Sequence, residues 1–245
     1  MPDGICLYAV GDIHGERGAL DRLLTMIDQD RQRRSHLRPL LVFLGDYVDR
    51  GVDSCGVIER LSSGPLPGVE CRFLLGNHEE AMLAFLDDPV GNAEWLRFGG
   101  AETLASYGIP PSVGITDRTR CEALRDALAE RLPTRHLEFL QGLEHLLVIG
   151  DYAFVHAGIA PGRRLDRQRQ EDMLWIRTPF LSSTLRHDRV IVHGHTIVDE
   201  PEILFNRIAI DTGAYATGVL TGLVLFGNHR DIIQSGPRDH GRPEQ

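Results

Sequence analysis

The stretch ICLYAVGDIHG, residues 5–15, joins a strand-length apolar run to a polar loop bounded by Gly11 and Gly15. The continuous run Ile5–Val10 is typical of a buried strand. Apolar residues then recur at helical spacing, at Leu20, Leu23, Leu24 and Ile27. This order of strand, glycine loop and helix is the opening of a βαβ unit.

Two further segments repeat this order. Pro39–Leu44 leads into the loop Gly45–Gly51, and Cys71–Leu75 leads into Gly76–Glu79. Three such units predict an α/β fold that begins with parallel strands. Because ligands of these sheets bind beyond the carboxyl ends of the strands, the glycine loops are the first candidates for a functional site.

The rest of the chain has a different pattern. Helices are predicted at Ala93–Tyr107, Arg118–Arg131 and Thr134–Gln141, and the last third alternates short apolar runs with hairpin signals. Parallel strands in the first third and hairpins in the last third together predict two packed mixed β-sheets flanked by helices. We expect a single domain over 1–245, with a helical insertion at about 93–142. Residues of about 228–245 are expected to form a loose tail, with a last edge strand as the alternative.

The composition excludes several classes of function. The chain has 35 acidic and 26 basic residues, a formal net charge of −9, and no lysine among its bases. Without lysine, an ordinary P-loop NTPase and a Schiff-base enzyme are both excluded. The acidic balance also disfavours nucleic-acid binding, which requires a basic face.

Cysteine usage and hydropathy bear on the location of the protein. The four cysteines lie far apart, without the paired spacing of a zinc or redox site, and are expected to be small buried side chains in a reducing compartment. The N-terminus lacks the basic region of a signal peptide, and no window approaches the ~18 apolar residues of a membrane span. We expect a cytoplasmic protein with neither a membrane nor a nucleic-acid partner.

The strand-end loops carry side chains that can bind metals and phosphate. Asp12 and His14 are two positions apart, so in an extended chain they would project to the same side and could hold a divalent ion; a solvated loop is the alternative. The second loop adds Asp46, which takes the place of Asp12 on the next strand and could be shared with a second ion. Asp49 and Arg50 in the same loop could also be a surface ion pair.

Three later loops extend the pattern. Asn77 and His78 are adjacent and point different ways, so one can face a metal and the other the substrate. His156 and His195 follow two later strands in glycine-containing loops. Five loops that carry Asp, Asp, Asn, His and His indicate a metal site with oxygen and nitrogen ligands. The histidines in helical or turn contexts are expected to be structural: His36, His136, His145, His187, His229 and His240.

Taken in order, the five motifs resemble the calcineurin-like metallophosphoesterases. They are GDIHG at 11–15, GDYVDRG at 45–51, GNHE at 76–79, HAG at 156–158 and GHT at 194–196, and the similarity covers about Tyr8 to Phe226. More narrowly, the chain resembles the bacterial phosphoprotein phosphatases, a serine/threonine-specific family that is related to symmetrical diadenosine tetraphosphatases. Trp95–Tyr107 and LWIR at 174–177 are also similar to segments of bacterial members. The resemblance implies a four-layer α/β/β/α sandwich.

The resemblance also implies a role for each residue. Two divalent ions, manganese first with iron or zinc as alternatives, would share Asp46. His78 would be the general acid, oriented by Asp49. Arg50 and Arg177 would bind the substrate phosphate, although only the short match around Trp175 locates Arg177. The first ion would be bound by Asp12, His14 and Asp46 and the second by Asp46, Asn77, His156 and His195, with His193 behind His195 rather than a ligand.

The implied reaction is hydrolysis of a phosphomonoester by direct attack of a metal-bound hydroxide. Two divalent ions can provide that hydroxide at neutral pH and neutralise the phosphate, arginine forks bind the remaining oxygens, and an imidazolium protonates the leaving alkoxide. Phosphoserine or phosphothreonine in proteins is the expected substrate. The alternatives are a dinucleoside polyphosphate (diadenosine tetraphosphate) hydrolase with the same metal core and a non-catalytic sensor of phosphorylated ligands.

Overall fold

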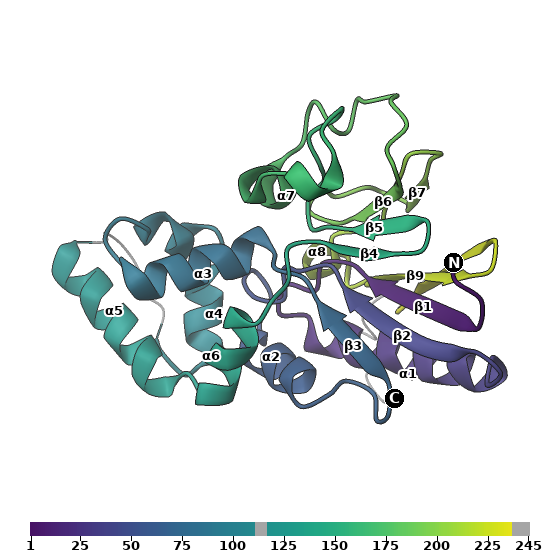
Figure 1. The fold of residues 1–245 in the computed structure, drawn as a ribbon. Coiled ribbons are helices and arrows are strands. Elements are labelled where there is room, and N and C mark those ends of the chain that lie inside the picture. Colours follow the sequence, from purple (N-terminus) through teal and green to yellow (C-terminus); the bar gives the residue numbers. More distant parts are fainter. Residues whose placement is uncertain (111–116, 237–245) are drawn as a thin grey trace.

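Two five-stranded sheets form the centre of the structure, a computed structural model that describes residues 1–110 and 117–236 (Figure 1). The first sheet has the strand order β10-β9-β1-β2-β3 and the second the order β4-β5-β6-β8-β7. Each sheet contains parallel and antiparallel pairs, which confirms the predicted fold class. The strands are β1 (Ile5–Val10), β2 (Arg38–Phe43), β3 (Glu70–Phe73), β4 (Leu147–Ile149), β5 (Tyr152–Phe154), β6 (Val190–His193), β7 (Glu202–Ile203), β8 (Arg207–Ala209), β9 (Thr221–Phe226) and β10 (His229–Gln234).

The first three strands are parallel neighbours, as the repeated strand–loop–helix order predicts. Each is followed by a helix: α1 (Arg17–Arg33), α2 (Ser54–Ser62) and α3 (Asn77–Asp87). The carboxyl ends of β1, β2 and β3 therefore lie at one edge of the sheet, and their glycine loops lie side by side there.

Side chains on the two faces of β1 enter different parts of the core. Cys6, Tyr8 and Val10 pack against the helices, whereas Leu7 and Ala9 face the second sheet. Both faces are buried, which explains why this strand is a continuous apolar run. A third apolar cluster covers the outer face of the second sheet and includes residues of α7 (Gln170–Trp175) and the loop after it. The layers are thus helix, sheet, sheet and a thin cover that contains α7.

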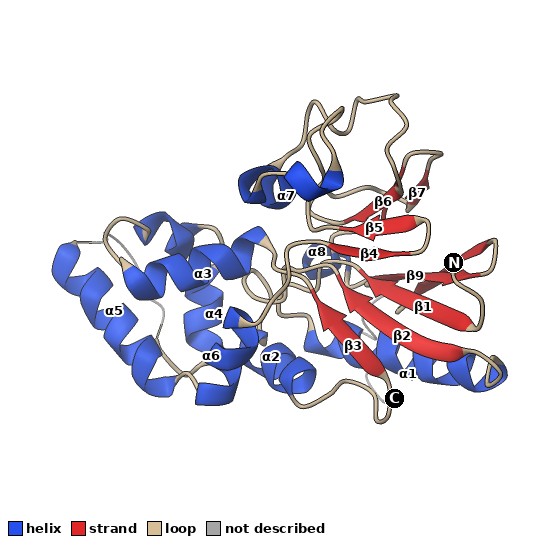
Figure 2. Ribbon diagram, in the orientation of Figure 1, coloured by secondary structure: helices blue, strands red, loops and turns tan. Residues whose placement is uncertain are grey.

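The described residues 93–110 and 117–142 are mainly helical and lie with α3 to one side of the sheets (Figure 2). They include the 3₁₀ helix η1 (Ala93–Arg97), α4 (Gly100–Ser106), α5 (Arg118–Arg131) and α6 (Thr134–Gln141). The expectation of one helix over Ala93–Tyr107 is wrong, because the chain breaks at Gly99, where φ is 117°. A Cβ on Gly99 would lie 2.5 Å from the backbone nitrogen of Arg50, so the break lets this segment touch the second glycine loop.

The end of the chain differs from the expected loose tail. Residues His229–Gln234 form β10, which pairs antiparallel with β9 at the edge of the first sheet. The alternative of a last edge strand is therefore the correct one for this part. Residues 237–245 lie outside the described part of the chain.

The expectation of four buried cysteines is met for two of them. Cys6 and Cys121 are buried, but Cys55 and Cys71 are only half-buried, and all four are free thiols. In the described ranges, no helix is both long enough and apolar enough to cross a bilayer.

Candidate metal centre and active site

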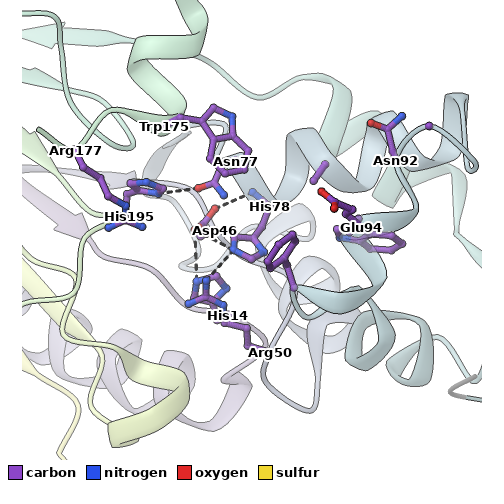
Figure 3. A pocket seen from close by; sticks show the side chains of 14 residues that line it. His14, Asp46, Arg50, Asn77, His78, Asn92, Glu94, Trp175, Arg177 and His195 are labelled. Carbon is purple, nitrogen blue, oxygen red and sulfur yellow. Dashed lines mark hydrogen bonds and ion pairs between the residues drawn. The ribbon is translucent and has the colours of Figure 1, made fainter. Parts of the chain in front are cut away.

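Side chains from five separate loops meet beyond the carboxyl ends of the strands, and Figure 3 shows four of the side chains of this region, His14, Asp46, Asn77 and His195. Asp12 follows β1, Asp46 follows β2, and Asn77 is the first residue of α3. His156 and His195 follow the parallel strands β5 and β6 of the second sheet. Each of these side chains is at most 9% exposed. The structure therefore brings together, from both sheets, residues that are up to 183 positions apart in the chain.

Asp46 stands between two groups of potential metal ligands. Its Oδ2 lies 3.4 Å from His14 Nε2, and its Oδ1 lies 3.4 Å from His156 Nε2. One group is His14, Asp46 and His78, and the other is Asp46, His156 and His195. In each group the candidate ligand atoms lie within 4.8 Å of one another. The two oxygens of one carboxylate thus face two different clusters, as a bridging ligand requires.

Hydrogen bonds behind the histidines leave lone pairs facing other acceptors. His14 Nδ1 donates to the Val48 carbonyl at 2.9 Å, so its Nε2 turns a lone pair toward Asp46. His156 Nδ1 donates to the Leu44 carbonyl at 2.9 Å, and its Nε2 faces Asn77 Oδ1 at 2.9 Å. Burial lowers the pKa of the His14 ring to about 3, which keeps it neutral. Two hydrogen-bond acceptors repel each other when no hydrogen lies between them. A cation between the two would bind both lone pairs and remove this repulsion.

Two further polar atoms in the same region have no partner in the described residues. They are Asp12 Oδ1 and His195 Nε2, and both are buried. Burial and the neighbouring carboxylates of Asp211 and Asp46 raise the pKa of Asp12 well above its usual value. An ionised Asp12 therefore needs a positive charge beside it. Orphaned oxygen and nitrogen atoms around a shared carboxylate fit divalent cations.

The local backbone differs from the expectation for Asp12 and His14. His14 has φ of 47°, so the two residues are not in an extended segment, and Asp12 lies outside both ligand clusters. Its Oδ2 instead accepts the backbone N–H of His195 at 2.9 Å. Asp46 and His195 also have positive φ, at 52° and 62°. Such left-handed residues are strained and concentrate at functional sites.

A close approach of two loops places Asp46 beside α3. Gly45 has φ of 101°, and a Cβ there would lie 2.6 Å from the backbone nitrogen of Gly76. Only glycine can occupy both the conformation and the space. Glu79, which is fully buried, then accepts the backbone N–H groups of Asp46, Tyr47, Val48 and Gly76 at 2.8, 2.7, 3.1 and 3.0 Å. The GNHE motif contains Glu79, but its neighbours along the sequence do not reveal this role.

His78 and Asp49 form a buried hydrogen-bonded pair. His78 Nδ1 lies 2.6 Å from Asp49 Oδ2. Asp49 is fully buried and also accepts from Trp95 Nε1 at 2.9 Å and from Thr103 Oγ1 at 2.6 Å. Burial alone would lower the pKa of His78, but the carboxylates of Asp46 and Asp49 raise it above its usual value. The expected pair therefore exists, and the helical insertion supplies two donors that sequence reasoning missed.

Two arginines line the cavity of about 290 Å³ that opens at these clusters (Figure 3). Arg50 Nη2 lies 3.2 Å from His78 Nε2, and its guanidinium is 4.8 Å from the ring centre of Tyr215. Arg177 Nη1 donates to Thr196 Oγ1 at 2.9 Å, directly after His195. Arg177 lies two residues beyond the end of α7.

His193 lies behind the centre. It is fully buried, packs edge-on against Phe180 with ring centres 5.1 Å apart, and belongs to neither ligand cluster. His193 therefore lies outside both groups of candidate ligands, and its role behind His195 stays a prediction.

Comparison with known proteins agrees with this geometry. Residues 7–227 match the family described as calcineurin-like phosphoesterase. The chain is 28% identical to an asymmetrical bis(5'-nucleosyl)-tetraphosphatase of Halalkalibacterium halodurans, with 87% of each chain covered. It is 28% identical to serine/threonine-protein phosphatase 2 of Salmonella typhimurium, covering 88% of this chain and 90% of the relative. It is 38% identical to a symmetrical bis(5'-nucleosyl)-tetraphosphatase of Legionella pneumophila, with 94% and 96% covered.

These relatives are named for different substrates, since two are bis(5'-nucleosyl)-tetraphosphatases and one is a serine/threonine-protein phosphatase. The family match extends from β1 to the end of β9 and includes every loop that reaches the metal-ligand clusters. The chain therefore belongs to the calcineurin-like phosphoesterase family.

Proposed function

We propose that this protein is a dinuclear metal-dependent phosphatase that hydrolyses phosphoserine or phosphothreonine in proteins. The observation that carries the dinuclear assignment is Asp46, whose two oxygens face two separate ligand clusters. When bound, the two ions would supply an activated water and neutralise the phosphate. Asp12, His14 and Asp46 would hold the first ion, and Asp46, Asn77, His156 and His195 the second; the donor set suits manganese, iron or zinc.

Metal removal is the first test of this assignment. No thiolate belongs to the proposed ligand set, so we expect chelators to strip the site. Activity toward p-nitrophenyl phosphate should vanish after EDTA treatment and dialysis and return on addition of Mn²⁺. Full activity of protein shown to be metal-free by elemental analysis would contradict the proposal.

The chain's own residues divide the remaining work. His78, held by Asp49, would donate a proton to the leaving oxygen of the substrate. Arg50 and Arg177 would bind the phosphate oxygens from two sides of the cavity, since Arg50 lies next to His78 and Arg177 next to His195. Planar guanidinium groups can bind two oxygens of one phosphate and stabilise their charge in the transition state.

Arg177 gives the sharpest test of phosphate binding because it is exposed and its loss should not disturb the fold. We expect Arg177→Ala to lower kcat/KM by a factor that corresponds to about 2–4 kcal/mol of lost transition-state stabilisation, the range for one preorganised donor. Arg177→Lys should not restore activity, because lysine lacks the planar pair of donors. Inorganic phosphate should inhibit Arg177→Ala less than the parent enzyme. A change of kcat/KM within a factor of about two, typical of surface substitutions, would remove Arg177 from the site.

The charge of the cavity favours a phosphomonoester over a dinucleoside tetraphosphate. Arg50 and Arg177 are the only arginines among the described residues that line it, and the chain has no lysine. A tetraphosphate carries negative charge on every phosphate and would need cations along its whole length. Two arginines beside the metal ligands are sufficient for one phosphate.

A dinucleoside polyphosphate remains the second candidate, because two exposed aromatic side chains line the same cavity. Phe98 is 63% exposed and Trp175 is 49% exposed, and aromatic rings can stack on nucleobases. Rates on phosphopeptides and on diadenosine tetraphosphate, measured side by side, distinguish these substrates. Turnover of an aryl phosphate distinguishes either enzyme from a sensor without activity.

A further inference from the structure

The active-site cavity has two chemically different ends. Figure 3 shows Arg177 and His195 on one side of His78 and Glu94 and Asn92 on the other. The first end contains a phosphate-binding arginine and metal-ligand candidates. The second lies on the helical insertion, where Glu94 belongs to the first turn of η1. A phosphate bound among the metal ligands would leave this second end to the rest of the substrate.

The negative charge of the Glu94 carboxylate opposes the binding of a phosphate in the same cavity. Glu94 is exposed, and in residues 1–110 and 117–236 no ion pair or hydrogen bond to its side chain is found. An unpaired carboxylate repels an incoming dianion, so it weakens binding unless the substrate brings a positive group to it. This end of the cavity therefore suits a substrate that is anionic at one point and cationic at another.

An aromatic side chain lies at the same end. Phe98 directly follows η1, the 3₁₀ helix that contains Glu94, whereas Trp175 belongs to the first end, where its ring centre lies 6.2 Å from that of His195. Phe98 exposes 63% of its surface at the same cavity. Ammonium and guanidinium groups bind the faces of aromatic rings, and a neighbouring carboxylate adds to that attraction.

We infer that the end of the cavity formed by Glu94 and Phe98 binds an arginine or lysine side chain of the protein substrate, close in sequence to the phosphorylated residue. The inference rests on the proposed function and adds a sequence preference to it. A nucleotide explains the site less well, because its additional phosphates would pass an unpaired carboxylate.

Phosphopeptides test the inference directly. The set consists of phosphoserine peptides that carry one arginine at successive positions on either side of the phosphoserine, compared with an alanine parent. We expect arginine at one of these positions to raise kcat/KM by about tenfold through a lower KM. Glu94→Gln, which removes the charge and keeps the shape, should abolish this preference, and Phe98→Ala should reduce it. Both variants should hydrolyse p-nitrophenyl phosphate at the parent rate, because this substrate has no cationic group for Glu94 and Phe98 to bind.

Glu102→Gln is the matched control, since Glu102 is an exposed acid on the neighbouring helix α4 that does not belong to the described cavity lining. It should keep the arginine preference. The inference is overturned if p-nitrophenyl phosphate is hydrolysed but no arginine position is preferred, or if the preference survives in Glu94→Gln. It is also overturned if Glu94→Gln alters diadenosine tetraphosphate hydrolysis instead of peptide hydrolysis. If the parent protein hydrolyses none of these substrates, aryl phosphate included, both the proposed function and this inference are overturned.

Discussion

Asp46→Asn is expected to lose both bound metal and activity on every phosphorylated substrate. Its two carboxylate oxygens each lie 3.4 Å from a histidine of a different cluster, so one substitution weakens both sites at once. An amide has no charge, and its nitrogen cannot bind a cation. Changes to groups behind the ligands typically cost 10–100-fold in metal affinity or activity, and we expect a larger loss for the shared ligand itself. Manganese titration followed by calorimetry, together with metal content and kcat/KM, measures both effects.

Asp21→Asn is the control for Asp46→Asn, because Asp21 is a partly exposed carboxylate on α1 that contacts Arg17 and Arg60. It should retain the metal content and rate of the parent. Two metal equivalents in folded Asp46→Asn, with normal affinity, would contradict the bridging role. A loss of only one equivalent would place Asp46 in a single site.

His78→Asn is expected to lower kcat by roughly 10²–10⁴, the usual range for a general acid. The neighbouring carboxylates of Asp46 and Asp49 favour the protonated ring, which is the form that can donate. The deficit should therefore depend on the leaving group. It should be large for a phosphoserine peptide, whose alkoxide must be protonated, and small for p-nitrophenyl phosphate, whose phenolate leaves unaided.

Metal content must be measured on the same His78→Asn protein, because His78 Nε2 lies 4.0 Å from Asp46 Oδ2 and belongs to the first ligand cluster. Two bound metal equivalents, together with the leaving-group dependence, would support the role of His78 as general acid. Loss of one equivalent would make His78 a ligand instead. Equal deficits on good and poor leaving groups would count against proton donation by this residue.

Much of the fold could be predicted from local patterns. Ile5–Val10 is apolar at every position because both faces of β1 are buried, and the glycine loops follow the strands directly. Parallel strands bring their carboxyl ends to one edge, so the co-location of Asp12, Asp46 and Asn77 follows from the order of elements alone. The errors arose where backbone conformation depends on a contact, as at Gly99, which breaks the predicted helix beside Arg50.

The sequence by itself determined which residue types lie at the strand ends, because the apolar runs and the glycines that follow them locate those ends. Only the tertiary structure decided how they are held and what surrounds them. Trp95 and Thr103 reach Asp49 across 46 and 54 positions, and Glu79 gathers four backbone N–H groups from two loops. Glu94 enters the cavity only because η1 packs beside α3. Such contacts depend on how separate elements pack, and the periodicity of residues along the chain does not predict this packing.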